Sequence, residues 1–149
     1  MTRDRRAAPL VLDASVLVEL LIDGAHRAAA DRLLDRIRDD GDLLLVTAAH
    51  GVVEAAHALR RLVRQGVLSD DDGAAAVRGL GQLDLVLDPT SPRLPVVWRL
   101  RDRMSAYDAA YAAAADALGL PLITTDDRLR RTCESEGIAC QHLREVFTV

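Results

Sequence analysis

Five short apolar runs alternate with helix-patterned segments along this chain, and that alternation limits the possible folds more than any other feature. The runs are predicted as buried strands at residues 10–12, 43–46, 85–87, 121–124 and 138–140. Amphipathic spacing predicts helices at 15–21, 25–37, from 47 or 50 to about 65, 73–83, 96–103, 105–118 and 126–135, with a last turn at 143–147. Strands that alternate with helices pair in parallel, so we expect an α/β fold with helices on both faces of the sheet.

The length of 149 residues suits one domain, and we predict a short flexible extension at residues 1–9 followed by a single domain at residues 10–149. No apolar run approaches the roughly 18 residues that a membrane span requires. The two cysteines, Cys133 and Cys140, lack metal-site spacing and suggest a reducing compartment. These features predict a cytoplasmic protein that makes no membrane contact.

The first apolar run ends in Asp13, a carboxylate directly before a predicted helix. In open α/β sheets, ligands bind at the carboxyl ends of strands where the strand order reverses. If the chain builds outward through three strands and then returns to the far side of the first, the first and fourth strands become neighbours. Asp13 and Asp126, which follows the fourth strand, would then flank this switch point.

Two further acids can reach the same edge of the sheet. Asp108 lies in the first turn of an alanine-rich helix, and Glu54 lies on the helix after the second strand. Each of the four acids also has a simpler explanation. Asp13 and Asp126 can be helix N-caps, while Asp108 can complete a capping box with Ser105. Glu54 can belong to a solvated helix face, so for each residue alone both interpretations stay open.

Taken together, the four acids favour a metal site. Carboxylates that gather in one cleft raise each other's pKa, and a divalent cation relieves this repulsion. Oxygen ligands without His or Cys suit Mg²⁺ or Mn²⁺ rather than Zn²⁺. Such a cation polarises a phosphate and lowers the pKa of a bound water, which predicts phosphodiester hydrolysis. The net charge of −4 argues against a nonspecific nucleic-acid binder that depends on bulk charge, but an acidic nuclease site is compatible with it.

The order of these motifs resembles that of the PIN-domain family, and more closely that of VapC-type toxins from bacterial toxin–antitoxin pairs. The resemblance rests on LDAS at 12–15, Glu54 followed by ALRR at 58–61, YDAAY at 107–111 and LPLITTD at 120–126. No single motif is specific, but their order and spacing from residue 10 to about residue 130 are.

The resemblance implies a five-stranded parallel sheet of order 3-2-1-4-5 between helices. It also implies a Mg²⁺- or Mn²⁺-dependent endoribonuclease that hydrolyses RNA. Carried over to this sequence, the acidic quartet of the family falls on Asp13, Glu54, Asp108 and Asp126.

The resemblance further assigns roles within the quartet. Asp13 and Asp108 would bind the metal directly, while the other two acids would hold a second metal, metal-bound waters or the attacking water. Ser15 and Thr124 match hydroxyl positions that support the site through hydrogen bonds. Asp127 stands at a variable position of the family and ranks below its neighbour Asp126.

The family resemblance also implies a homodimer and a cognate VapB-like antitoxin whose C-terminal segment lies in a groove beside the active site. Apolar residues of the first two predicted helices could form that groove, or they could be ordinary core: Val16, Leu17, Leu20, Leu21, Leu33 and Leu34. Candidate phosphate contacts are nine arginines: Arg60, Arg61, Arg64, Arg99, Arg101, Arg103, Arg128, Arg130 and Arg131.

Two other functions compete with the ribonuclease. A phosphatase of the haloacid-dehalogenase type also places an Asp after its first strand, but it needs a second Asp two residues later and a lysine. Here position 15 is Ser15, and all 19 basic residues are arginine. The other alternative is a non-catalytic α/β binding module whose acids are only helix caps. Added Mn²⁺ should stabilise a true acidic cluster by mass action and should not stabilise unrelated caps.

Overall fold

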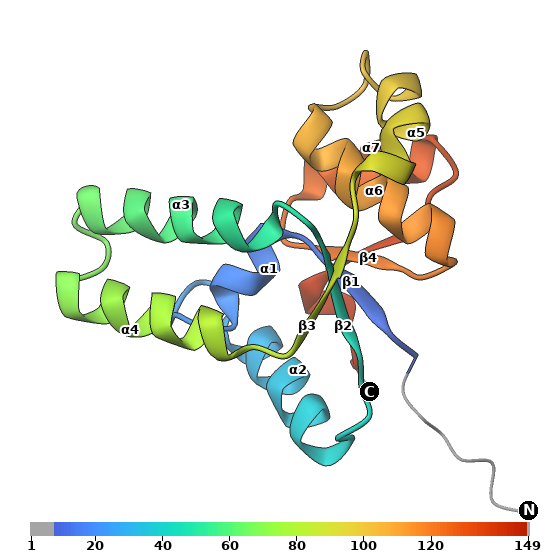
Figure 1. Cartoon of the computed structure of the whole chain (residues 1–149). Coiled ribbons are helices and arrows are strands. Elements are labelled where there is room, and N and C mark those ends of the chain that lie inside the picture. Colours follow the sequence, from blue (N-terminus) through green and yellow to red (C-terminus); the bar gives the residue numbers. More distant parts are fainter. Residues whose placement is uncertain (1–7, 149) are drawn as a thin grey trace, which may run out of the picture.

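A five-stranded parallel sheet of order β3-β2-β1-β4-β5 forms the centre of the protein (Figure 1). The computed structural model describes residues 8–148. Its strands are β1 (Leu10–Leu12), β2 (Leu45–Ala48), β3 (Leu85–Asp88), β4 (Leu122–Thr124) and β5 (Cys140–His142). Every neighbouring pair of strands is parallel, which confirms the α/β class and the sheet order that the sequence resemblance implied.

Seven α-helices and two short 3₁₀ turns accompany the strands within residues 8–148. They are α1 (Ala14–Glu19), α2 (Arg27–Asp39), α3 (Gly51–Arg64), α4 (Asp70–Gln82), η1 (Ser91–Arg93), α5 (Leu94–Arg99), α6 (Ala106–Leu118), α7 (Asp127–Ser135) and η2 (Leu143–Glu145). In Figure 1, α5, α6 and α7 gather on one side of the sheet and α1 to α4 on the other, with α3 and α4 forming a hairpin that extends away from it.

Helix α6 packs directly on the central strands β1, β2 and β4. Its residues 109–115 are all buried, and all but Tyr111 are alanine. Small side chains let a helix approach a sheet closely, and a helix that is apolar on every side belongs in a core. The helix ends at Gly119, whose left-handed φ of 64° is a conformation that glycine adopts without a steric cost. This packing fixes the first turn of α6, and with it Asp108, above the end of β1.

The predicted fifth strand is wrong by two residues. We expected it at residues 138–140, whereas β5 is Cys140–His142. The N–H of Ile138 donates to the Cys133 carbonyl at 2.9 Å and thereby closes the end of α7. Ile138 is buried, but its backbone completes a helix, so pairing with β4 begins only at Cys140.

Two other boundaries move for local reasons. The predicted helix at 96–103 begins earlier, as η1 and α5, because Pro92 and Pro95 occupy first-turn positions that need no N–H donor. The predicted strand at 43–46 begins later, because the N–H of Leu43 closes a turn onto the Asp40 carbonyl at 3.0 Å.

A close approach at Gly51 sets the direction of α3. A Cβ atom at this position would lie 2.2 Å from the Thr47 hydroxyl oxygen, so any side chain would push the start of α3 away from β2. The Thr47 hydroxyl in turn donates to the Leu12 carbonyl at 2.8 Å. The beginning of α3, which carries Glu54, is thus held close to the end of β1.

The six apolar residues that the sequence singled out in the first two helices belong to the core or pack against it. Val16, Leu17, Leu20 and Leu33 are buried, and Leu21 and Leu34 pack against the core as partly buried residues. Among residues 8–148, none of the large exposed apolar side chains comes from α1 or α2.

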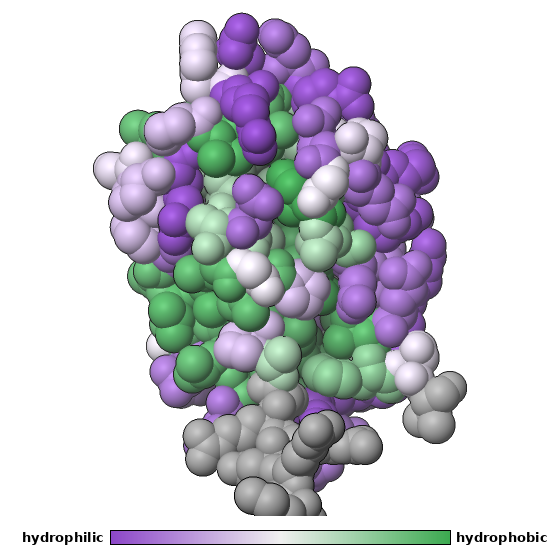
Figure 2. Space-filling view, turned by 90° about the vertical axis from the view of Figure 1, so that its right-hand side faces the viewer, coloured by the Kyte–Doolittle hydropathy of each residue, from purple (hydrophilic) through white to green (hydrophobic). Residues whose placement is uncertain are grey.

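Apolar surface does occur elsewhere. On the face shown in Figure 2 it reaches the centre and lower left, while hydrophilic residues follow the upper and right-hand margins.

No helix within residues 8–148 combines the length and the apolar character that crossing a membrane requires. The predicted extension at residues 1–9 lies almost entirely outside the described residues, which include only its last two positions. Both cysteines are buried and unpaired by disulfides, Cys133 on α7 and Cys140 on β5.

Candidate active site

Asp13 lies where strand β1 ends and helix α1 begins, and only 5% of its surface is exposed. Its Oδ1 accepts hydrogen bonds from the Val16 N–H at 3.2 Å and from the Ser15 hydroxyl at 2.5 Å. Its Oδ2 accepts a hydrogen bond from the Thr124 hydroxyl at 2.5 Å. These three donors fix both oxygens of the carboxylate.

The same two hydroxyls connect β1 to the loop after β4, its neighbour in the sheet. The Thr125 N–H donates to Ser15 Oγ at 3.0 Å, and the Asp126 N–H donates to Thr124 Oγ1 at 3.0 Å. The Thr124 hydroxyl therefore bridges the backbone N–H of Asp126 and the carboxylate of Asp13. Ser15 and Thr124 lie against Asp13, where they can orient it, and their part in a reaction stays a prediction.

Burial raises the pKa of Asp13 to about 6, compared with an ordinary value of 3.8. The hydrogen bonds from Ser15, Thr124 and Val16 each lower this pKa, and the Asp108 carboxylate raises it again. Ionised Asp13 therefore destabilises the folded protein, and a nearby positive charge would reduce this destabilisation.

Asp108 lies in the first turn of α6 and is half-buried. Its backbone N–H donates to Ser105 Oγ at 3.2 Å, which confirms Ser105 as the cap of this helix. Burial raises the pKa of Asp108, and the Asp126 carboxylate raises it further, whereas His50, Ser105 and Arg128 lower it. The pKa of Asp108 thus depends both on Asp126, which follows β4, and on His50 at the start of α3.

Glu54, in the first turn of α3, is half-buried and lines the same cavity as Asp108, so it does not lie on a fully solvated face. Burial raises its pKa, the Asp108 carboxylate raises it further, and the Tyr111 hydroxyl lowers it. Its Oε2 lies 3.2 Å from the Nε2 atom of His50. Sequence reasoning did not single out His50, although its place four residues before Glu54 puts both on one side of a helix.

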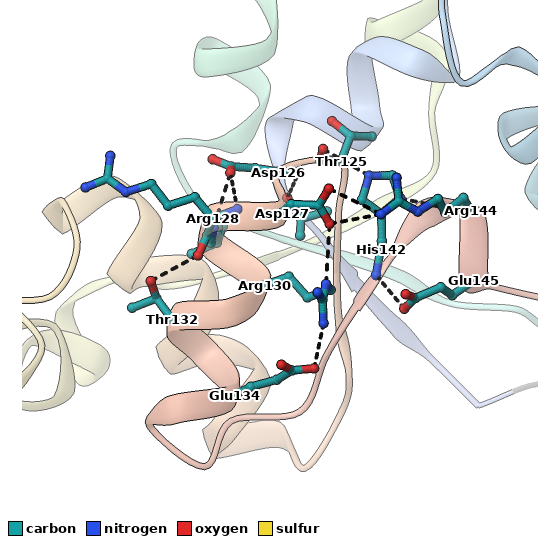
Figure 3. A network of polar contacts seen from close by, with 12 residues as sticks. Thr125, Asp126, Asp127, Arg128, Arg130, Thr132, Glu134, His142, Arg144 and Glu145 are labelled. Atoms are coloured by element: carbon teal, nitrogen blue, oxygen red, sulfur yellow. Dashed lines mark hydrogen bonds and ion pairs between the residues drawn. The ribbon is translucent and has the colours of Figure 1, made fainter.

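Asp126 and Asp127 point to opposite sides of the beginning of α7 (Figure 3). Oδ1 of Asp126 caps α7 by accepting from the N–H groups of Arg128 and Leu129 at 2.9 and 3.2 Å. Asp127 instead faces β5 and η2, where it pairs with Arg144 at 3.1 Å. The two neighbours therefore differ in environment, and Asp126 alone faces Asp108.

The four predicted acids approach one another in pairs centred on Asp108. That carboxylate interacts electrostatically with Asp13, Glu54 and Asp126. Among residues 8–148, no group of three acidic, histidine or cysteine side chains is close enough to hold one ion in common. The donor set still fits a hard cation, because all four donors are carboxylates and Mg²⁺ commonly keeps several waters beside one or two protein ligands.

Two cavities meet at Asp108. One of about 250 Å³ is lined by Arg103, Arg128 and Asp126 among others, so two of the predicted phosphate contacts lie beside the acids. The other, of about 510 Å³, lies toward α3 and the ring of Tyr107. Arg130, by contrast, is paired with Glu134 at 2.7 Å and does not line either cavity.

Comparisons with known proteins point to one family. The PIN-domain family matches residues 10–135. Ribonuclease VapC12 of Mycobacterium tuberculosis is 35% identical over 123 residues, or 83% of this chain and 91% of the relative. Ribonuclease VapC1 of the same species is 35% identical over 133 residues, or 88% and 93%.

Solved structures share the fold. PAE2754 from Pyrobaculum aerophilum has a TM-score of 0.65 and 26% identity, covering 91% of this chain and 92% of its own. VapC20 of Mycobacterium tuberculosis, a sarcin-ricin loop cleaving toxin, has a TM-score of 0.61 and 16% identity, with coverages of 87% and 96%.

Proposed function

The chain belongs to the PIN-domain family, among relatives named VapC ribonucleases, and from this premise we propose that it is a metal-dependent endoribonuclease and the toxin of a toxin–antitoxin pair. The observation that carries the proposal is the electrostatic coupling of Asp108 with three other acids, each from a different element around the end of β1. Acids that raise each other's pKa in this way form a set whose repulsion a divalent cation would relieve.

In this proposal Asp13 and Asp108 bind Mg²⁺ or Mn²⁺ directly. The cation, when bound, polarises the scissile phosphate and lowers the pKa of a water. Glu54 and Asp126 orient water and accept a proton at their carboxylate oxygens. Ser15 and Thr124 donate to the two oxygens of Asp13 and so hold that carboxylate in one orientation. Arg103 and Arg128, beside Asp108, attract the RNA backbone.

A cognate antitoxin, a homodimeric state and a cytoplasmic location complete the proposal. A groove of about 500 Å³ between α1 and α3 begins beside Glu54 and is lined by Val18, Ile22 and Leu62 among other apolar residues. Glu19, also in this groove, has a buried Oε2 that makes no hydrogen bond within the described residues. An apolar antitoxin segment with one basic residue would fit such a groove. Co-expression with the neighbouring upstream gene should relieve growth inhibition.

The direct test is cleavage of RNA by the purified protein. Asp13→Asn or Asp108→Asn should lower the cleavage rate by about 100-fold or more and abolish growth inhibition, with the fold unchanged by circular dichroism. Asp116→Asn is the matched control, because this exposed acid lies at the other end of α6 and should leave cleavage unchanged. Full activity in repurified Asp13→Asn protein, or no stabilisation of the wild type by Mn²⁺, would end the proposal.

A further inference from the structure

Three rings lead from the core to the surface beside Asp108. Tyr111 is fully buried, and the centroid of its ring lies 4.7 Å from that of His50. The His50 ring in turn lies 5.5 Å from that of Tyr107, in an edge-on arrangement. Tyr107 is 65% exposed. An exposed aromatic ring is thus supported from behind by two further rings, which lie tilted or edge-on to one another.

The exposed ring borders the larger of the two cavities at Asp108. This cavity of about 510 Å³ lies between the beginnings of α3 and α6 and is lined by His50, Val53, Glu54, His57, Ser105, Tyr107 and Asp108. Val53, from α3, is 72% exposed and adds a second apolar surface. A hollow with an aromatic wall, an aliphatic wall and a few polar groups has the chemistry of a site for a flat, partly apolar ring.

The smaller cavity, on the other side of Asp108, has the opposite character. It is lined by Arg103 and Arg128 next to Asp126, and the Arg103 guanidinium also pairs with Glu136 at 3.0 Å. Figure 3 shows Arg128 extending from the beginning of α7 on the same side as Asp126. Asp108 lines both cavities and so separates an aromatic hollow from a cationic one. A nucleotide likewise combines a flat base and an anionic phosphate, which are joined through a sugar.

We propose that the cavity beside Tyr107 is a nucleobase subsite, in which a base of single-stranded RNA stacks on the Tyr107 ring. This inference rests on the proposed ribonuclease function and adds a positioning residue to it. Single-stranded RNA is the form that fits, because its unpaired bases can turn outward and stack on aromatic side chains. The packed ring of His50 restricts Tyr107, so little conformational freedom is lost when a base binds. A base held here places its sugar–phosphate chain along Asp108.

The test compares two short oligomers, each about eight units long. One is a fluorescein-labelled single-stranded RNA of randomised sequence, and the other is an oligomer of tetrahydrofuran phosphate spacers that carries no bases. Binding is measured by fluorescence anisotropy with Ca²⁺ in place of Mg²⁺, and a gel confirms that the RNA stays intact. Tyr107→Ala should weaken RNA binding by about 5- to 150-fold and leave binding of the base-free oligomer unchanged.

Three further variants separate stacking from other effects. Tyr107→Phe keeps the ring and should bind RNA like the wild type, whereas Tyr107→Leu keeps apolar bulk and should lose as much affinity as Tyr107→Ala. Trp98→Ala is the matched control, because Trp98 is also exposed, at 69%, but lines neither cavity and should have no effect.

The outcomes distinguish this inference from the function on which it rests. Unchanged RNA binding in Tyr107→Ala and Tyr107→Leu, in a protein that still cleaves RNA, overturns the base subsite alone. An equal loss for both oligomers also overturns it, because the effect would then lie in the backbone contacts or the fold. If the wild type neither binds nor cleaves RNA, the ribonuclease function fails and the subsite fails with it.

Discussion

Replacing Asp13 with Asn should stabilise the metal-free protein, even though it removes the proposed activity. Burial gives the folded protein a pKa of about 6 at this carboxyl, against an ordinary value of 3.8. Each pKa unit corresponds to about 1.4 kcal/mol, so the ionised carboxylate destabilises the folded state by about 3 kcal/mol above pH 6. Asparagine is neutral and does not carry this cost.

The substitution also removes one favourable contact. Oδ2 of Asp13 accepts the Thr124 hydroxyl, and an amide nitrogen in its place cannot accept a hydrogen bond. The loss is about 1 kcal/mol, so the net stabilisation is about 2 kcal/mol. In a domain of this size that corresponds to a rise in Tm of about 4–8 °C.

The pH dependence of the difference identifies its cause. The folded pKa is raised, so the folded state binds the proton more tightly and the wild type loses stability as the pH rises from about 4 to about 6. The amide of the Asp13→Asn variant cannot titrate, so the variant should match or fall below the wild type near pH 4 and exceed it above pH 6. Urea unfolding followed by circular dichroism in EDTA measures both proteins across this range. A variant less stable than the wild type at neutral pH, or a difference that does not change with pH, would refute the reasoning.

Three other perturbations test the contacts around this carboxylate and the sheet. Thr124→Val should destabilise the protein by about 2 kcal/mol in urea, because a buried hydroxyl no longer bonds a carboxylate; unchanged stability would contradict this. Arg93→Ala should cost about 3–5 kcal/mol, because it leaves the buried Asp88 without its partner at 2.7 Å, and the double variant with Asp88→Asn should recover most of that loss in the same assay. Asp127→Asn should lower Tm slightly and keep RNA cleavage, whereas Asp126→Asn should lose cleavage by about 100-fold or more; equal activities would mean that their opposite orientations do not matter.

The sequence predicted the class of fold because its signal is local and repeated. Each strand is a short apolar run next to a helix, and parallel pairing follows from that alternation. The boundaries depend on single backbone hydrogen bonds that no pattern reveals. Ile138 has the side chain of a buried strand, yet its N–H closes a helix. Burial also decided the role of Leu17 and Leu33, which are equally apolar whether they face a partner or the core.

The sequence identified the four acids of the candidate site but not how their side chains are arranged. Asp126 and Asp127 are adjacent identical residues, and only the direction of the chain at the beginning of α7 separates them (Figure 3). The ring series at Tyr107 was invisible in the sequence, because His50 lies more than fifty residues from it and meets it only where the beginnings of α3 and α6 border the same cavity. Contacts across such separations depend on the sheet order rather than on any motif.

The structure confirms that Asp13 and Asp126 are helix N-caps, while their role in catalysis stays a prediction. Asp126 caps α7 through Oδ1 alone, so its second oxygen is not used by the cap. Asp13 caps α1 through one oxygen and is held by β4 through the other. A cap fixes a carboxylate at the end of a strand in one orientation, and both capping carboxylates, Asp13 and Asp126, interact with Asp108. Helix capping therefore holds Asp13 and Asp126 in place near Asp108. In the proposed function, Asp126→Ala, which removes one cap and one carboxylate, should weaken Mn²⁺ stabilisation of the whole protein.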